Sequence, residues 1–195
     1  MQEAAALPLQ TNTGLDNRKL LMWLFLGSEC LFFGSLISAY LLYRDRSVVG
    51  PYPRELYDIP FTSVSSFVLL MSSLSMVLAL AAIQRGDLRQ MRVWLLATSF
   101  LGLLFLSGQA FEFTQFYREG LSLHANMFGT TFFVLTGFHG AHVTVGVLIL
   151  LSIVALSWRG HITEEHALNV ELAGLYWHFV DIVWIVIFTL VYLIK

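Results

Sequence analysis

The sequence has little charge. Only 12% of its 195 residues are Asp, Glu, Lys or Arg, whereas soluble domains have roughly 25%. Hydrophobic residues make up 57% of the chain. This composition excludes an ordinary soluble protein and predicts an integral membrane protein.

Cysteine and clustered basic residues are scarce too. The single cysteine, Cys30, excludes a disulfide framework and a paired-thiol metal site, and we expect it to be a small hydrophobic residue of the core. The sequence contains no CxxCH haem attachment. The net charge is −2. Because there is neither a basic stripe nor a glycine-rich loop that would cradle phosphate, we expect no nucleic-acid partner.

What the sequence has instead is long apolar runs. Five of them exceed the roughly 18 residues that a membrane-spanning helix needs. They cover residues 20–43, 61–83, 93–116, 127–158 and 172–194. The runs are continuously apolar rather than alternating, which favours helices over a β-barrel. The first run is too long for the core of a signal peptide, and no cleavage site follows it. We therefore predict an all-α, polytopic membrane protein, with one transmembrane domain over residues 1–195 that forms a bundle of five transmembrane helices.

Lys and Arg are divided almost evenly between the two sides of the predicted bundle. Six fall on the side of the N-terminus and five on the other. The compact cluster RGDLRQMR between the second and third runs is the clearest inward signal. We expect the N-terminus in the cytoplasm and the C-terminus outside. The loop RDRSVVGPYPRELYDIP, with three prolines, is then expected to be an ordered outer connection.

Ionisable side chains are rare inside the predicted spans. Each costs at least about 2.5 to 3.5 kcal/mol at the centre of a bilayer unless protein receives it. They are Glu29, Glu112, His139, His142, His178 and Asp181, with Glu171 just before the last span. Gln109 shares a helical face with Glu112. Glu171, His178 and Asp181 fall within about 80° of one another at 100° per residue, so we expect these faces to look at protein rather than at lipid.

Small residues are expected to let the helices approach closely. The fourth run contains Gly137, Gly140 and Ala141. The first run has a sector made of Gly27, Ser28, Gly34, Ser35, Ser38 and Ala39. We expect both sectors to face neighbouring helices in a compact bundle. Glu29 and Asp181 fall at one depth near the middle of the bilayer, and whether Glu29 contacts a histidine of the fourth run is left open.

Several functions suit such polar groups. His139 and His142, three residues apart, could be two ligands of one metal ion, but a di-iron enzyme or a haem protein would offer more paired histidines. A proton-coupled transporter would use intramembrane carboxylates, yet five spans do not divide into two repeats. In the plainest interpretation the polar groups hydrogen-bond to one another and to the serines of SVSSFVLLMSSLS. The residues alone thus indicate a membrane bundle that is part of a larger assembly.

Four of the spans contain motifs that are more specific. They read WLFLGSECLFFGSLISAYLLYR, GLLFLSGQAFEF, TTFFVLTGFHGAHVTVGVL and LYWHFVDIVWIVIFTLVYL. In this order, over nearly the whole chain, they resemble subunit III of the haem-copper terminal oxidases, and most closely the cytochrome c oxidase subunit III family. The chain looks like the short bacterial form, which lacks the two N-terminal helices of the longer form.

The resemblance implies an accessory subunit of a proton-pumping oxidase that reduces oxygen to water in the bacterial plasma membrane. Such a subunit has no catalytic residue, redox cofactor or metal of its own: subunit I holds haem and copper, and subunit II receives electrons from cytochrome c. It stabilises the catalytic subunit, supports proton uptake and binds phospholipid, although a lipid cleft enclosed by the missing helices cannot form here. The positions that we take as structural or related to proton uptake are Glu29, Gln109, Glu112, His139, His142, Glu171, His178 and Asp181.

The branch of the family is a separate question. Subunit III of quinol oxidases and accessory proteins of nitric oxide reductases have the same five spans. We favour the cytochrome c branch because the first span reads SEC rather than having an aspartate at that motif. A stand-alone proton-coupled transporter is the alternative from another class.

Overall fold

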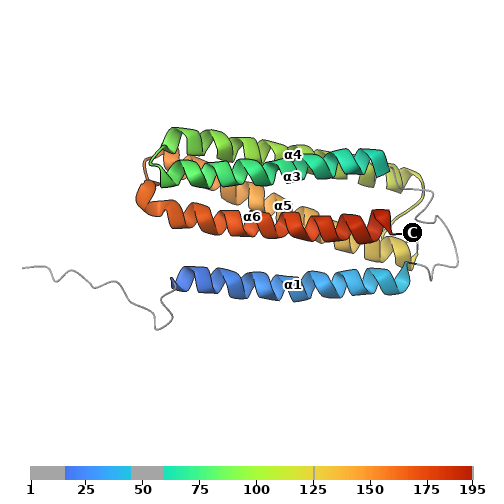
Figure 1. The fold of residues 1–195 in the computed structure, drawn as a ribbon. Helices are drawn as coiled ribbons and strands as arrows, with labels where there is room; N and C mark the ends of the chain where they lie inside the picture. The colour runs from blue at the N-terminus through green and yellow to red at the C-terminus, as the bar shows by residue number, and fades with distance from the viewer. Residues whose placement is uncertain (1–15, 45–58, 125, 195) are drawn as a thin grey trace, which may run out of the picture.

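A computed structural model describes residues 16–44, 59–124 and 126–194 of the chain. The described part consists of five long helices with no strand (Figure 1). The helices are α1 (Asn17–Tyr43), α3 (Ile59–Gln84), α4 (Leu88–Arg118), α5 (Met127–Trp158) and α6 (Ala167–Phe188). A single 3-10 turn, η1 (Glu164–His166), precedes α6, and a π-helical turn, η2 (Thr189–Leu193), continues it. All five are long and apolar enough to cross a membrane, so the prediction of an all-α bundle of five spans is confirmed.

Helices α1 and α4 begin before their apolar residues do, because polar side chains cap them. Asp16 accepts a hydrogen bond from the backbone N–H of Arg18 at the start of α1, and Asp87 accepts one from Gln90 at the start of α4. Such caps satisfy backbone donors that the first turn leaves unpaired. The helices are therefore slightly longer than the hydrocarbon stretch that marks them in the sequence. The proline-containing loop expected outside lies mostly within residues 45–58, which are outside the described residues.

The helices α3, α4, α5 and α6 form a four-helix body, and α1 lies along one side of it (Figure 1). Among the described helices, α3 packs mainly on α4 and α6, and α1 packs mainly on α5 and α6. Three large side chains of α1 are buried, Leu26, Phe33 and Tyr40. They recur every seven residues and thus form one narrow stripe along the helix.

The sector of small residues on α1 does not face the bundle, contrary to our expectation. Gly27, Ser28, Gly34, Ser35 and Ser38 are all exposed. A methyl group added at Gly27 or Gly34 would meet no other residue within 4 Å. Cys30 is exposed as well, so its expected place in the core is wrong. The reason is that an apolar or small side chain gains nothing by leaving lipid, and large side chains fill the space to α5 and α6 better.

The close helix approaches occur instead around Trp177 of α6. Its fully buried indole lies between α4 and α5. A Cβ atom at Gly102 would come within 2.6 Å of the ring, and one at Gly146 within 2.8 Å. In the sector expected on α5, only Gly140 is tightly packed: a Cβ atom added there would lie 2.6 Å from Oε1 of Gln109. Gly137 has open space, and Ala141 is exposed.

Candidate functional site

The first polar pair joins α1 to α5. Nε2 of His142 lies 3.3 Å from Oε2 of Glu29, so the contact left open by the sequence is made. The geometry is that of an ion-pair contact, since Oε2 makes no aligned hydrogen bond with the described residues. Nδ1 of His142 is 2.8 Å from the carbonyl oxygen of Phe138. Because a carbonyl only accepts, Nδ1 bears a hydrogen and Nε2 is the nitrogen that faces the carboxyl group.

This geometry lets the pair lie within the hydrocarbon layer without a net charge. With Nδ1 protonated, one further proton shared between Nε2 and Oε2 leaves the pair with no net charge. It can be a carboxylic acid beside an imidazole or a carboxylate beside an imidazolium. Either form avoids the cost of an isolated charge within the bilayer.

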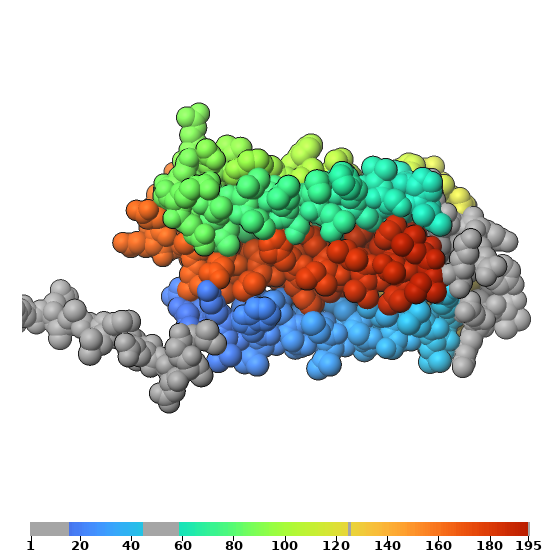
Figure 2. All heavy atoms as spheres, in the orientation of Figure 1, coloured from blue at the N-terminus to red at the C-terminus, as the bar shows by residue number. Residues whose placement is uncertain are grey.

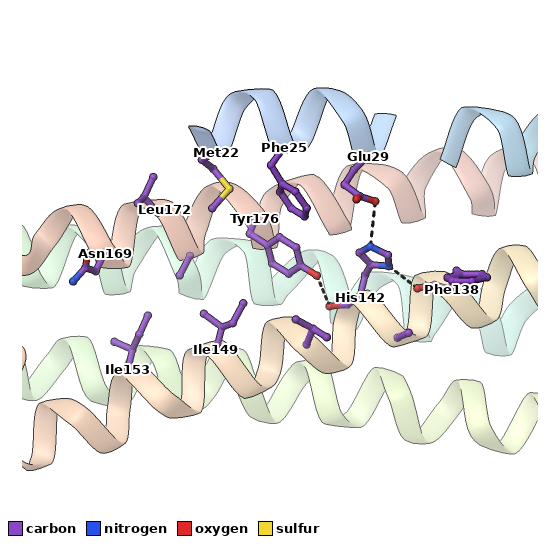
Figure 3. Close-up of a pocket in the computed structure, with 13 residues that line it drawn as sticks. Met22, Phe25, Glu29, Phe138, His142, Ile149, Ile153, Asn169, Leu172 and Tyr176 are labelled. Carbon is purple, nitrogen blue, oxygen red and sulfur yellow. Dashed lines mark hydrogen bonds and ion pairs between the residues drawn. The ribbon is translucent and has the colours of Figure 1, made fainter. Parts of the chain in front are cut away.

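The pair borders an apolar cavity of about 710 Å³ between α1, α5 and α6 (Figure 3). Apart from Glu29 and His142, the polar residues in its lining are Asn169 and Tyr176. The Tyr176 hydroxyl donates to the carbonyl oxygen of His142 at 3.0 Å. The rest of the lining is aliphatic and aromatic, including Met22, Phe25, Ile149 and Leu172. Such a cavity can hold an apolar chain and offers one carboxyl–imidazole pair beside it.

The second polar group joins α6 to α3. Nδ1 of His178 lies 2.6 Å from Oγ of Ser73. The hydrogen-bond partner of His178 thus lies in the second span. Asp181, one turn further along α6, is buried, and the Ser73 hydroxyl lies near its carboxyl group. Neither carboxyl oxygen, however, meets the geometry of a hydrogen bond with the described residues.

His139 has a different environment from His142. Its fully buried ring stacks on Trp184 at 4.8 Å and meets the edge of Phe105 at 5.8 Å. Neither ring nitrogen has a hydrogen-bond partner among the described residues. Since one imidazole faces α6 and α4 and the other faces α1, the two histidines do not form a joint pair of metal ligands. Within the described ranges, no three His, Cys, Asp or Glu side chains are grouped so that they could hold a metal ion.

The face of α4 that Gln109 shares with Glu112 is buried as predicted, and Gly102 and Phe116 are buried with it. Nε2 of Gln109 donates to the carbonyl oxygen of Thr136 on α5 at 2.8 Å. The Thr62 hydroxyl on α3 donates to Oε1 of Glu112 at 2.9 Å. The hydroxyl-bearing ring of Tyr192, in η2, lies beside the same carboxyl group. These two polar side chains of α4 therefore connect it to both neighbouring helices.

Glu171 is separate from the other polar residues of α6. It forms an ion pair with Lys19 of α1, with Nζ 2.7 Å from Oε1. Although Glu171 and His178 share one face of an ideal helix, the first contacts α1 and the second α3. This difference arises because α6 lies between those two helices (Figure 1).

The serines of the second span form a ladder with α6. Nε1 of Trp177 donates to Oγ of Ser72 at 2.9 Å, and Nε1 of Trp184 donates to Oγ of Ser66 at 2.8 Å. The sequence indicated these serines as hydrogen-bond partners for polar groups, but not that they receive the two tryptophans. It did not single out Lys19 or Tyr176, because a cation at a span end and a tyrosine in a span are both common.

Comparisons with known proteins agree with one another. A family model described as cytochrome c oxidase subunit III matches residues 1–195. Cytochrome c oxidase subunit 3 of a Synechocystis species is 43% identical, covering 88% of this chain and 73% of the relative. The subunit of the same name from Bacillus sp. strain PS3 is 37% identical, covering 91% and 86%. Quinol oxidase subunit 3 of Bacillus subtilis is 35% identical, covering 97% and 92%.

Proposed function

The chain belongs to the cytochrome c oxidase subunit III family, and from this we propose that it is an accessory scaffold subunit without a redox centre of its own. As a subunit III it is a multi-pass membrane protein and part of a haem-copper oxidase, an oxidoreductase complex with other subunits. In the proposal, subunit I holds haem and copper, and subunit II receives the electrons. This chain stabilises the catalytic subunit and supports its proton uptake.

The observation that carries the scaffold role is where the intramembrane polar groups find their partners. Glu29 contacts His142, Gln109 bonds to α5, Glu112 bonds to α3, and His178 bonds to Ser73. Each of these contacts joins two helices of the same chain. Groups used in this way hold a bundle together, as interhelical polar contacts do in other membrane proteins. The same observation supports a structural role for these five positions, and the ion pair with Lys19 extends it to Glu171. For His139 and Asp181, which are buried without a hydrogen bond in the described part of the chain, we propose the same role from burial alone.

We place the protein in a bacterial plasma membrane with its N-terminus in the cytoplasm. The basic residues near the α3–α4 turn, Arg85, Arg89 and Arg92, support this orientation because cytoplasmic loops are enriched in Lys and Arg. The apolar cavity between α1, α5 and α6 supports binding of a phospholipid acyl chain, since its lining is almost wholly apolar.

For the electron donor of the complex we propose cytochrome c. The relatives do not separate the two branches, because some are named cytochrome c oxidase subunit 3 and others quinol oxidase subunit 3 at similar identity. Quinol is therefore the second candidate. Oxygen consumption by the purified complex with reduced cytochrome c, and then with a quinol, discriminates them: rapid turnover with quinol alone assigns the chain to the quinol branch.

The scaffold role is tested by comparing the purified oxidase with and without this chain. The initial rate of oxygen consumption should be nearly the same in both, because the redox groups are elsewhere. The oxidase that lacks the chain should lose activity after fewer turnovers. The proposal would be contradicted if the initial rate fell in proportion to the fraction of complexes that lack the chain while the haem content stayed constant. So would a stoichiometric haem or metal bound to the isolated polypeptide.

A further inference from the structure

The surface formed by α3 and α6 has one polar spot at the depth of the membrane centre. It consists of His178 and Ser73, which bond to each other at 2.6 Å and are both only half-buried. His178 lies eleven residues after the start of α6, or about 16 Å along the helix. That is close to the middle of a hydrocarbon layer about 30 Å thick.

His178 lies on the outward stripe of α6. At 100° per residue it shares this stripe with Ile182 and Ile185, which are 59% and 43% exposed. On α3, the neighbouring outward residue is Val77, which is 50% exposed. In Figure 2, α6 runs between α3 and α1 on the face toward the viewer. The polar spot is therefore surrounded by side chains that meet whatever covers this face.

The hydrogen-bonding capacity of the spot is not used up within the chain. Nε2 of His178 makes no hydrogen bond with the described residues. Beneath it, Asp181 is only 3% exposed, and both of its carboxyl oxygens lack a hydrogen bond in the described part of the chain. Within a bilayer there is no water to serve such groups, and polar side chains there normally face protein.

We propose that the α3–α6 face, centred on His178, is where a transmembrane helix of another oxidase subunit docks. The helix presents a neutral side chain that can both donate and accept, a hydroxyl or a carboxamide, at the depth of His178. This inference goes beyond the scaffold role and does not depend on it, because it needs only that the chain is one subunit of an oxidase complex.

Two observations favour a protein helix at the α3–α6 face over a lipid acyl chain there or docking at another face. An acyl chain cannot bond to an imidazole nitrogen, so lipid alone would leave Nε2 unpaired. The exposed sector of α1, with Gly27 and Gly34, is another candidate docking surface, but each serine in it donates a hydrogen bond to a backbone carbonyl of α1. The polar atoms that need an outside hydrogen-bond partner, Nε2 of His178 and the carboxyl oxygens of Asp181, therefore lie at the α3–α6 face.

Photo-crosslinking in the intact oxidase tests which face is covered. Benzoylphenylalanine is placed at Ile182 or Val77, next to the spot, and at two control positions. The controls are Phe100 of α4 and Leu148 of α5, which are 65% and 58% exposed and hence similarly accessible in this chain. We expect adducts with another oxidase subunit from the first two positions and none from the controls. Adducts only from the controls, a band of two copies of this chain, or no adduct at Ile182 and Val77 in an intact complex would each overturn the proposal.

A pair of substitutions separates docking from the internal hydrogen bond. His178→Leu removes both ring nitrogens, whereas Ser73→Ala removes only the partner within the chain. We expect His178→Leu to lower the amount of subunit III that stays bound to the purified oxidase about three- to tenfold. This is the effect of losing one interhelical hydrogen bond. Ser73→Ala should have little effect, and His178→Gln should restore part of the binding. Equal losses from His178→Leu and Ser73→Ala would show that only the internal bond matters.

Discussion

Adding one methyl group to Gly146 should destabilise the whole bundle. The new Cβ atom would lie 2.8 Å from Cε3 and Cζ3 of Trp177 and 3.3 Å from Cε1 of Tyr176. The indole cannot retreat, because Gly102 of α4 closes its other side and its Nε1 is bonded to Ser72 of α3. Overpacking of this kind typically costs about 1 to 3 kcal/mol.

The assay is the temperature at which subunit III unfolds in the purified oxidase, followed by near-ultraviolet circular dichroism of its tryptophans against an oxidase that lacks the chain. For a protein of this size, 1 kcal/mol shifts the midpoint by about 2 to 4 °C, so Gly146→Ala should lower it by about 2 to 12 °C. The matched control is Gly137→Ala on the same helix, where nothing lies within 4 Å. That variant should be neutral or slightly stabilised, because alanine is the better helix former.

The reasoning is refuted if the two glycine variants unfold at the same temperature. A second check uses the ring itself. If the clash is with Trp177, then Gly146→Ala combined with Trp177→Phe should cost less than the sum of the two single changes, since the smaller ring leaves room for the methyl group. Strict additivity would mean that the destabilisation comes from elsewhere.

Two further predictions concern polar contacts between helices. Glu29→Leu should weaken the attachment of α1 to α5 by about 1 to 3 kcal/mol, because it leaves Nε2 of His142 unpaired. Glu29→Gln should cost clearly less, because its amide still reaches that nitrogen. Equal unfolding midpoints of the two variants in an SDS titration would contradict this. Trp184→Phe should cost about 0.6 to 2 kcal/mol by removing the bond to Ser66. Adding Ser66→Ala to it should cost little more, and full additivity in the same titration would show that the bond contributes nothing.

The fold could be predicted from the sequence because the bilayer permits few solutions. Continuous apolar runs of more than about 18 residues must form helices that satisfy their own backbone. The buried face of α4 could also be predicted, since Gln109 and Glu112 are too polar to face lipid. The helix starts were less accurate, because caps such as Asp16 and Asp87 lie outside the apolar runs.

Which helix receives which polar side chain could not be predicted. Periodicity places Glu171 and His178 on one face of α6, but their partners, Lys19 and Ser73, depend on the order of helices around α6. The exposed glycines of α1 were misjudged for a related reason. Small residues permit close approach but do not require it, and the sequence of one chain does not say whether the neighbour belongs to that chain.

Helix α1 shows what the polar contacts accomplish in a bilayer. Its few buried apolar side chains give it little preference for one position over another, because lipid is as apolar as the surface of α5 or α6. Three polar contacts, however, hold it at three levels: Lys19 to Glu171, Glu29 to His142, and Arg44 to the carbonyl oxygen of Ile194 at 3.1 Å. Sliding α1 by one turn would break all three at once and leave Glu29 unpaired within hydrocarbon, at a cost of at least about 2.5 kcal/mol for that residue alone. The ionisable residues of this span therefore fix the register of α1, which its apolar surface cannot do.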